Sequence, residues 1–276
     1  MNKALVLIVS FLLLVSVMTP AQEKTYVTAG LSWWNAQYSY ETEEGNKIAD
    51  IGTGNMFGPY LSVSHGKFNF GASLFWGSFP VNEVAFGGTL EDVDVDFTMS
   101  RGDLNFTVGY RVSRYINLFL GSKFVNFKID GNLQTTMPVL IGYDFLGNPI
   151  YDDQVIKANL DWTQSGPTFG GGVSGVVPFG ATSHWYGFGS LALLFGNITN
   201  EVSVTGYSEK FENEISSNIV AVTLGVGYRA PSGLGVNLGY RADLYSGEVK
   251  DQDPAAVEEK VNTRVEGLIL TLSYSF

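Results

Sequence analysis

The stretch Val265–Phe276, VEGLILTLSYSF, decides the fold because apolar and aromatic residues occupy every second position up to its last residue. One face of this stretch carries Leu268, Leu270, Leu272, Tyr274 and Phe276, and the other carries Gly267, Ile269, Thr271, Ser273 and Ser275. A period of two is that of a β-strand. The apolar face covers about nine residues, the length that a tilted strand needs to cross the hydrocarbon of a bilayer. We therefore expect residues 265–276 to form a membrane-spanning strand.

A terminal Phe that follows Tyr and alternating apolar residues resembles the closing strand of bacterial outer-membrane β-barrel proteins. The resemblance implies that Leu268, Leu270, Leu272, Tyr274 and Phe276 form the signal that the barrel-insertion machinery reads. It also implies a Gram-negative outer membrane as the location and porin-like proteins as relatives, without pointing to a subfamily.

The amino terminus has the pattern of a secretory signal peptide. Lys3 supplies a basic residue, Ala4–Val17 is apolar, and Thr19-Pro20-Ala21 provides small residues for cleavage after Ala21. The apolar run is shorter than the roughly 18 residues that a spanning helix requires. We expect residues 1–21 to be removed and residues 22–276 to form a single β-barrel domain, a length usual for one such domain.

Composition narrows the choice of function. The chain has 27 Asp and Glu against 16 Lys and Arg, which makes nucleic acid an unfavourable partner. It has no Cys, so disulfides and a lipoprotein anchor are both excluded, and stability must come from closure of the sheet. The 33 Gly and 14% aromatic residues suit a barrel with a small-residue inner face and aromatic girdles. A secreted β-sandwich is the alternative.

Turn signals divide the chain into strands joined alternately by short and long connections. The expected short turns are 64–67, 113–115, 178–184 and 230–233, and the expected long loops are 41–55, 79–92, 130–155, 197–217 and 246–260. Nine connections join ten antiparallel strands, and twelve strands are the alternative. An even number of strands with short turns at one end is typical of outer-membrane barrels, whose short turns are periplasmic. We expect both termini to be periplasmic and the barrel to be a monomer.

Four further strands have an apolar face that we assign to lipid. These faces are Phe68, Phe70, Ala72, Leu74 and Trp76; Leu104, Phe106, Val108, Tyr110 and Val112; Val220, Val222, Leu224, Val226 and Tyr228; and Leu234, Val236, Leu238 and Tyr240. The strands at 26–40, 116–127 and 185–195 have mixed faces and cannot be oriented. The apolar phase changes around Ser165-Gly166-Pro167, which predicts a β-bulge there.

Several charged residues fall on the predicted inner faces. They are Arg111, Arg229, Arg241, Asp103 and Asp243. Unpaired charge in a narrow interior is costly, so these bases and acids are expected to pair. Two readings stay open, a polar plug that holds the barrel together and a ring of charges that selects ions.

Catalytic and metal-binding patterns are weak. The only histidines, His65 and His184, fall in predicted periplasmic turns, whereas outer-membrane proteases of the omptin family need an Asp–His pair at the extracellular rim. Ser64 and His65 are adjacent and point to opposite faces, which argues against a lipid hydrolase. Asp92, Asp94 and Asp96 lie on one side of a predicted strand edge and are the only candidate ligands for a hard cation. We predict no enzyme activity and no cofactor.

These patterns favour a small-solute channel with a weak preference for cations, because the inner faces are polar and the predicted loops are acidic. The alternative is a surface-binding or structural barrel without an open pore, and an outer-membrane protease or lipid hydrolase ranks last. The expected partners are outer-membrane lipid and lipopolysaccharide, the insertion machinery, and small cationic or neutral solutes.

Overall fold

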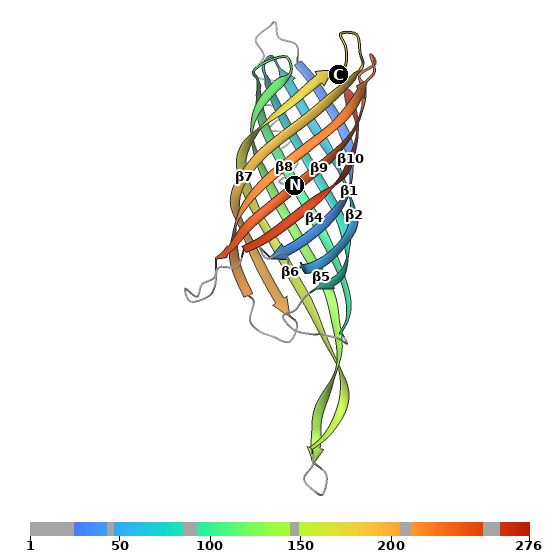
Figure 1. The fold of residues 1–276 in the computed structure, drawn as a ribbon, viewed down its shortest axis with the longest axis vertical. Helices are drawn as coiled ribbons and strands as arrows, with labels where there is room; N and C mark the ends of the chain where they lie inside the picture. Colours follow the sequence, from blue (N-terminus) through green and yellow to red (C-terminus); the bar gives the residue numbers. More distant parts are fainter. Residues whose placement is uncertain (1–24, 43–46, 85–92, 144–148, 205–210, 251–259) are drawn as a thin grey trace, which may run out of the picture.

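The computed structural model describes residues 25–42, 47–84, 93–143, 149–204, 211–250 and 260–276, which form ten β-strands (Figure 1). The strands are β1 (Thr25–Thr42), β2 (Lys47–His65), β3 (Phe68–Val84), β4 (Val93–Arg111), β5 (Ile116–Tyr143), β6 (Pro149–Pro178), β7 (Trp185–Val204), β8 (Phe211–Arg229), β9 (Leu234–Lys250) and β10 (Lys260–Ser275). None of the described residues forms a helix long and apolar enough to cross a membrane.

The ten strands form one closed antiparallel barrel, in which each strand pairs with its neighbours in the sequence and β1 also pairs with β10. The β1–β10 ladder runs from Thr28 opposite Ser275 to Thr42 opposite Val261 without a shift in register. At its end, Val27 and Phe276 exchange two backbone hydrogen bonds of 3.0 and 2.9 Å. The predicted ten-stranded antiparallel barrel is confirmed, and twelve strands are not needed.

The short turns lie at one end of the barrel together with the carboxyl terminus (Figure 1). They join β2 to β3, β4 to β5, β6 to β7 and β8 to β9, as the sequence predicts. Gly66 and Gly233 have φ angles of 57° and 95°, which a residue with a Cβ adopts only with strain. We call this end of the barrel the short-turn end.

The strands continue well into the segments that the sequence assigned to long loops, so those loop bounds were wrong. β5 and β6 stay paired as far as Tyr143 opposite Pro149, whereas the pairing of β4 with β5 stops at Thr135 and that of β7 with β6 stops at Leu160. The two strands therefore project as a long hairpin beyond the rest of the barrel (Figure 1). Polar residues remain in strands here because backbone pairing continues to satisfy the N–H and C=O groups outside lipid.

The outer surface carries the apolar faces that the sequence assigned to lipid. Leu104, Phe106, Val108 and Tyr110 of β4, and Val112 directly after it, are all exposed, while Asp103 and Gly109 on the opposite face of β4 are buried. The structure also orients the three strands with mixed faces: Leu31 and Trp33, Leu118 and Leu120, and Leu191 and Leu193 point outward. At the short-turn end the rings of Phe68 and Tyr110, and those of Trp185 and Tyr228, lie 5.3 and 5.1 Å apart and form part of a girdle.

The β-bulge expected at 165–167 is not formed. β6 pairs with β5 in continuous register through this segment, with Ser165 opposite Asn126 and Pro167 opposite Phe124. Leu160 and Gln164 are buried inside the barrel, whereas Phe169 is 61% exposed on the outside. The apolar residues change phase because the inner face of β6 is apolar at one end, while its outer face is apolar at the other.

Replacing Phe276 with Ser should lower the yield of folded barrel several-fold. Phe276 is 67% exposed on the outer surface next to Tyr274 and lies at the seam where β1 meets β10. A Ser at this position removes the terminal aromatic side chain from the predicted insertion signal. The measurement is the heat-modifiable, membrane-embedded fraction on an unboiled gel. Phe179→Ser is the matched control, because Phe179 is 62% exposed in a turn at the same end. Equal yields from the two variants would contradict a terminal signal.

Candidate functional site: the lumen and its cavity

A cluster of buried charges crosses the middle of the lumen. Arg101 on β4 donates two hydrogen bonds to Asp103, of 2.8 and 2.7 Å, and a third of 2.7 Å to the Tyr245 hydroxyl. Arg241 on β9 donates two bonds of 3.1 and 3.0 Å to Asp243. Each Arg–Asp pair is two residues apart on one strand, so both side chains of the pair point into the lumen.

Lys123 on β5 joins these two pairs. Its Nζ lies 3.1 Å from Asp103 and also donates a hydrogen bond to Asp243. Arg101 Nη2 lies 3.4 Å from the same Asp243 carboxylate. In the strand order of the closed barrel, β4 and β9 are five strands apart in both directions. The cluster of Arg101, Asp103, Lys123, Arg241 and Asp243, which we call the charge cluster, therefore connects opposite walls of the lumen.

Aromatic rings surround the charge cluster. The Arg101 guanidinium carbon lies 4.9 Å from the Phe127 ring centroid, and that of Arg241 lies 4.6 Å from the centroid of Trp34. The Trp34 ring packs edge-on against Phe75 at 6.2 Å. The side chains of Arg101, Asp103 and Asp243 are completely buried. The cations of this layer are therefore stabilised both by the carboxylates that pair with them and by the aromatic faces beside them.

On the long-hairpin side of the charge cluster the lumen is filled by apolar side chains. Buried residues there include Phe79, Met99, Ile129, Leu160, Ile198, Ile215 and Val261. Two cavities between these side chains and the charge cluster have volumes of only 20 and 10 Å³. Each is about large enough for one water molecule. This half of the barrel is therefore a packed core.

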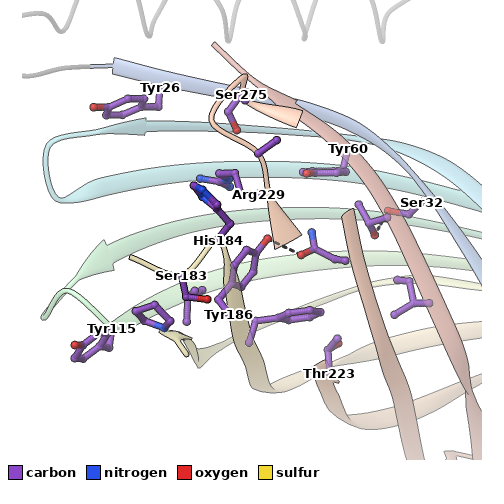
Figure 2. Close-up of a pocket in the computed structure, with 18 of the residues that line it drawn as sticks. Tyr26, Ser32, Tyr60, Tyr115, Ser183, His184, Tyr186, Thr223, Arg229 and Ser275 are labelled. Atoms are coloured by element: carbon purple, nitrogen blue, oxygen red, sulfur yellow. Dashed lines mark hydrogen bonds between the residues drawn. The ribbon is translucent and has the colours of Figure 1, made fainter. Parts of the chain in front are cut away.

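On the short-turn side the lumen contains a large cavity of about 1510 Å³ (Figure 2). Its wall includes Tyr26, Tyr60, Tyr115, Tyr186, Arg114, His184, Arg229, Asn237 and Ser275. Phe75 and Ile269 also line it, and the Arg241 guanidinium carbon lies 5.3 Å from the Phe75 ring centroid. The cavity therefore ends where the charge cluster begins.

Glycines make room for the aromatic side chains of this wall. A Cβ on Gly30 would lie 2.3 Å from the Tyr60 ring, and one on Gly227 would lie 2.4 Å from that of Tyr186. The rings therefore lie flat against the barrel wall and leave the centre open. Tyr186 donates a 2.6 Å hydrogen bond to Asn237 Oδ1 across the β7–β9 side of the cavity.

The structure brings together three of the five charged residues that the sequence placed in the lumen. Asp103, Arg241 and Asp243 belong to the charge cluster, whereas Arg111 and Arg229 are exposed at the short-turn end and pair with neither carboxylate. Arg111 is eight residues beyond Asp103 along β4, about 26 Å away. Sequence reasoning missed Arg101 and Lys123. Arg101 has a visible signal, because it lies two residues before Asp103 on the same face of the strand.

The remaining candidates contribute little to a site. Leu268, Leu272, Tyr274 and Phe276 of the predicted insertion signal are exposed on the outer surface, with Leu270 partly exposed between them. Asp92 and the side chains of Asp94 and Asp96 lie outside the described part of the chain, although the backbone of 94 and 96 pairs with Gln134 and Asn132. Among the described residues no cluster of His, Asp and Glu has the composition of a metal site. The signal peptide 1–21 also lies outside the described ranges.

Both histidines lie at the short-turn end. His65 hydrogen-bonds Thr25 at 3.0 Å, and the His184 ring packs edge-on against Tyr228 at 5.9 Å. The strand ends and turns of this end, within 25–33, 57–76, 104–122, 167–195, 219–240 and 267–275, contain no Asp or Glu. A His–carboxylate pair for hydrolysis is therefore not assembled among these residues.

Comparison with solved structures supports the fold. The crystal structure of the outer-membrane protease OmpT from Escherichia coli matches with a TM-score of 0.54 and 10% identity, covering 91% of this chain and 97% of that one. The toluene transporter TbuX from Ralstonia pickettii matches with a TM-score of 0.36 and 12% identity over 92% of this chain and 90% of that one. OprG, an outer-membrane protein from Pseudomonas aeruginosa, matches with a TM-score of 0.33 and 14% identity over 91% and 95% of the two chains.

No family model matches the chain, and no curated protein sequence matches it. The similarity to OmpT concerns the fold alone, because the identity is 10%. The chain therefore has the fold of an outer-membrane β-barrel protein, and its function has to be argued from its own residues.

Replacing Asp243 with Asn should lower the free energy of unfolding by about 3–5 kcal/mol, because it leaves buried Lys123 and partly buried Arg241 without their shared carboxylate. The measurement is equilibrium urea unfolding of the barrel refolded into lipid vesicles. Asp130→Asn is the matched control. Asp130 pairs with Lys128 through exposed side chains, so its loss should leave the unfolding curve unchanged. Coincident curves for the two variants would show that the charge cluster does not stabilise the barrel.

Proposed function

We propose that this protein is an outer-membrane barrel that does not conduct solutes and that acts through its two ends, as a binding or structural protein. The mature chain, residues 22–276, would be a monomer, since a closed sheet has no free edge for another copy. Its apolar outer face and aromatic girdle fit an outer membrane, with lipopolysaccharide around the hairpin end and the insertion machinery as an assembly partner.

The observation that carries this proposal is the charge cluster. Its salt bridges reach from β4 to β9 across the full width of the lumen, and Trp34, Phe75 and Phe127 pack around its cations. A hydrated ion would have to separate buried ion pairs to pass, at a cost of several kcal/mol for each uncompensated charge. The apolar core beyond the cluster adds a second barrier.

A channel, which the sequence favoured, has less support. Its argument used the polar inner faces of the strands. Those faces border the cavity at the short-turn end, but Asp103, Arg241 and Asp243 on them form part of the charge cluster that closes the lumen. A preference for cations is not part of the proposal, because the charge cluster and the apolar core leave no continuous path through the described part of the lumen. A hydrolase has no supporting pair of His and carboxylate at the short-turn end.

The β5–β6 hairpin is the feature that favours a role at the surface. It projects beyond β4 and β7 by many residues and is continuous with the barrel wall (Figure 1). A hairpin of this kind holds its tip away from the membrane on a semi-rigid support. Such a shape suits contact with a partner outside the lipopolysaccharide layer.

Planar-bilayer recording tests whether the lumen is closed. The mature protein should insert and give no steps of conductance in 1 M KCl, a concentration chosen to expose even a narrow pore. Protease protection of vesicles from the same preparation confirms insertion. The positive control is an open general porin inserted in the same way, which should give clear steps of conductance under the same conditions. Stable openings of the unmodified protein at low voltage would overturn the proposal in favour of a channel.

A further inference from the structure

The cavity at the short-turn end has a basic lining. Its charged or titratable lining residues, apart from tyrosines, are Arg114, His184 and Arg229, and no Asp or Glu is among the residues that line it. The wall also contains four tyrosine hydroxyls, those of Tyr26, Tyr60, Tyr115 and Tyr186. The Tyr186 hydroxyl already donates its proton to Asn237, and each of the other groups can donate a hydrogen bond to an anion.

This basic lining belongs to a wider separation of charge along the barrel. The strand ends and turns of the short-turn end contain His65, Lys67, Arg111, Arg114, His184 and Arg229 but no acidic side chain. Among the described residues of this end, the one anionic group is the terminal carboxylate of Phe276, at the rim beside Val27. The chain as a whole has a net charge of −11, so its short-turn end differs in sign from the rest.

The two cavity arginines are available to a ligand. Neither Arg114 nor Arg229 forms an ion pair with another described residue, in contrast to Arg101 and Arg241. The backbone N–H of Arg229 donates a 2.9 Å bond to the carbonyl of His184, which fixes the two residues next to each other, and their side chains lie together at the cavity (Figure 2). Arg114 lies 4.4 Å from the ring centroid of Tyr115, on the turn that joins β4 to β5.

The shape of the cavity suits a small molecule that enters from the short-turn end. Its volume of about 1510 Å³ exceeds the roughly 300–1,000 Å³ of typical ligand pockets, so it has room for a ligand and its water. Val176, Pro178 and Phe188 supply apolar wall between the polar groups. Because the charge cluster closes the inner end, a ligand would leave by the way it entered.

We infer that this cavity is a binding site for small organic anions, carboxylates or phosphates with a partly apolar body, taken up from the periplasmic side. Guanidinium groups bind carboxylate and phosphate oxygens through paired hydrogen bonds, and tyrosine hydroxyls add further donors. The site goes beyond the proposed closed barrel, because a barrel that served only as a support has no use for a cavity with free cations. Because the cavity is open to solvent, added salt should weaken the attraction between its cations and a bound anion.

Binding of pyrenetetrasulfonate, a fluorescent aromatic polyanion, tests the site. Fluorescence anisotropy is followed with the mature protein refolded in an uncharged detergent at low salt. The double variant Arg114→Gln with Arg229→Gln should weaken binding at least tenfold. The matched control is Lys67→Gln with Arg111→Gln, which removes the same charge from the same end at residues outside the cavity lining and should change binding less than twofold.

Competition identifies the group that is recognised. Displacement of the dye by citrate indicates a carboxylate site and displacement by inorganic phosphate indicates a phosphate site, while sucrose should displace nothing.

Equal weakening of dye binding by the two double variants would reduce the effect to general electrostatic attraction and overturn the site, as would the absence of dye binding. If the double variant does not fold, the comparison of Arg229→Gln alone with Arg111→Gln alone decides in the same way. Dye binding without conductance is compatible with a closed barrel, so the two proposals fail separately.

Discussion

The pairing of β1 with β10 is the interaction on which the rest of the structure depends. Within lipid an unpaired backbone N–H or C=O costs several kcal/mol, so a sheet can cross a membrane only when its first and last strands meet. The ladder from Thr28 to Thr42 opposite Ser275 to Val261 satisfies these groups without a shift in register. Closure by ten strands then sets the width of the lumen and leaves every second side chain pointing into it. The size and charge of those inward side chains decide whether each part of the lumen is an open path, a packed core or a cavity.

The lumen has a hollow part and a packed part, and the sizes of the inward side chains along each strand decide which part is which. On β1, Gly30 and Ser32 border the cavity side, and Trp34, Ala36 and Tyr38 are buried in the packed side. The charge cluster lies at the boundary. A buried ion pair often contributes little net stability compared with apolar packing, but an incomplete one is strongly destabilising. The cluster needs residues of β9 and of the neighbouring strands β4 and β5 at once, although β9 pairs with neither of them. It therefore penalises a change of register of β9 relative to β4 and β5 and favours one closed arrangement.

The outside of the barrel was predictable from the sequence, and much of the inside was not. Lipid imposes the same apolar period on each strand separately, so Phe106 and Leu224 could be assigned from their own neighbours, and three of the four short turns had local Gly or Pro signals. The charge cluster depends on contacts such as that between Arg101 and Asp243, 142 residues apart, which no local pattern contains. The loop bounds failed for a related reason. In the hairpin formed by the ends of β5 and β6 the sequence mixes polar and apolar residues without a clear period of two, so no local pattern marks these residues as strands.

A preference for cations did not follow from the acidic composition, because net charge is summed over the whole chain, whereas a solute responds only to nearby charges. An electrostatic potential acts on a solute only along the path that the solute can follow, and it is screened over about 8–10 Å in physiological salt. An apolar core separates the other end of the lumen from the space accessible at the short-turn end, which is lined by Arg114, His184 and Arg229. The net charge of −11 therefore averages two ends that are electrostatically separate. For a barrel closed in its middle, each end has to be treated as its own surface, and the end that contains the cavity is basic.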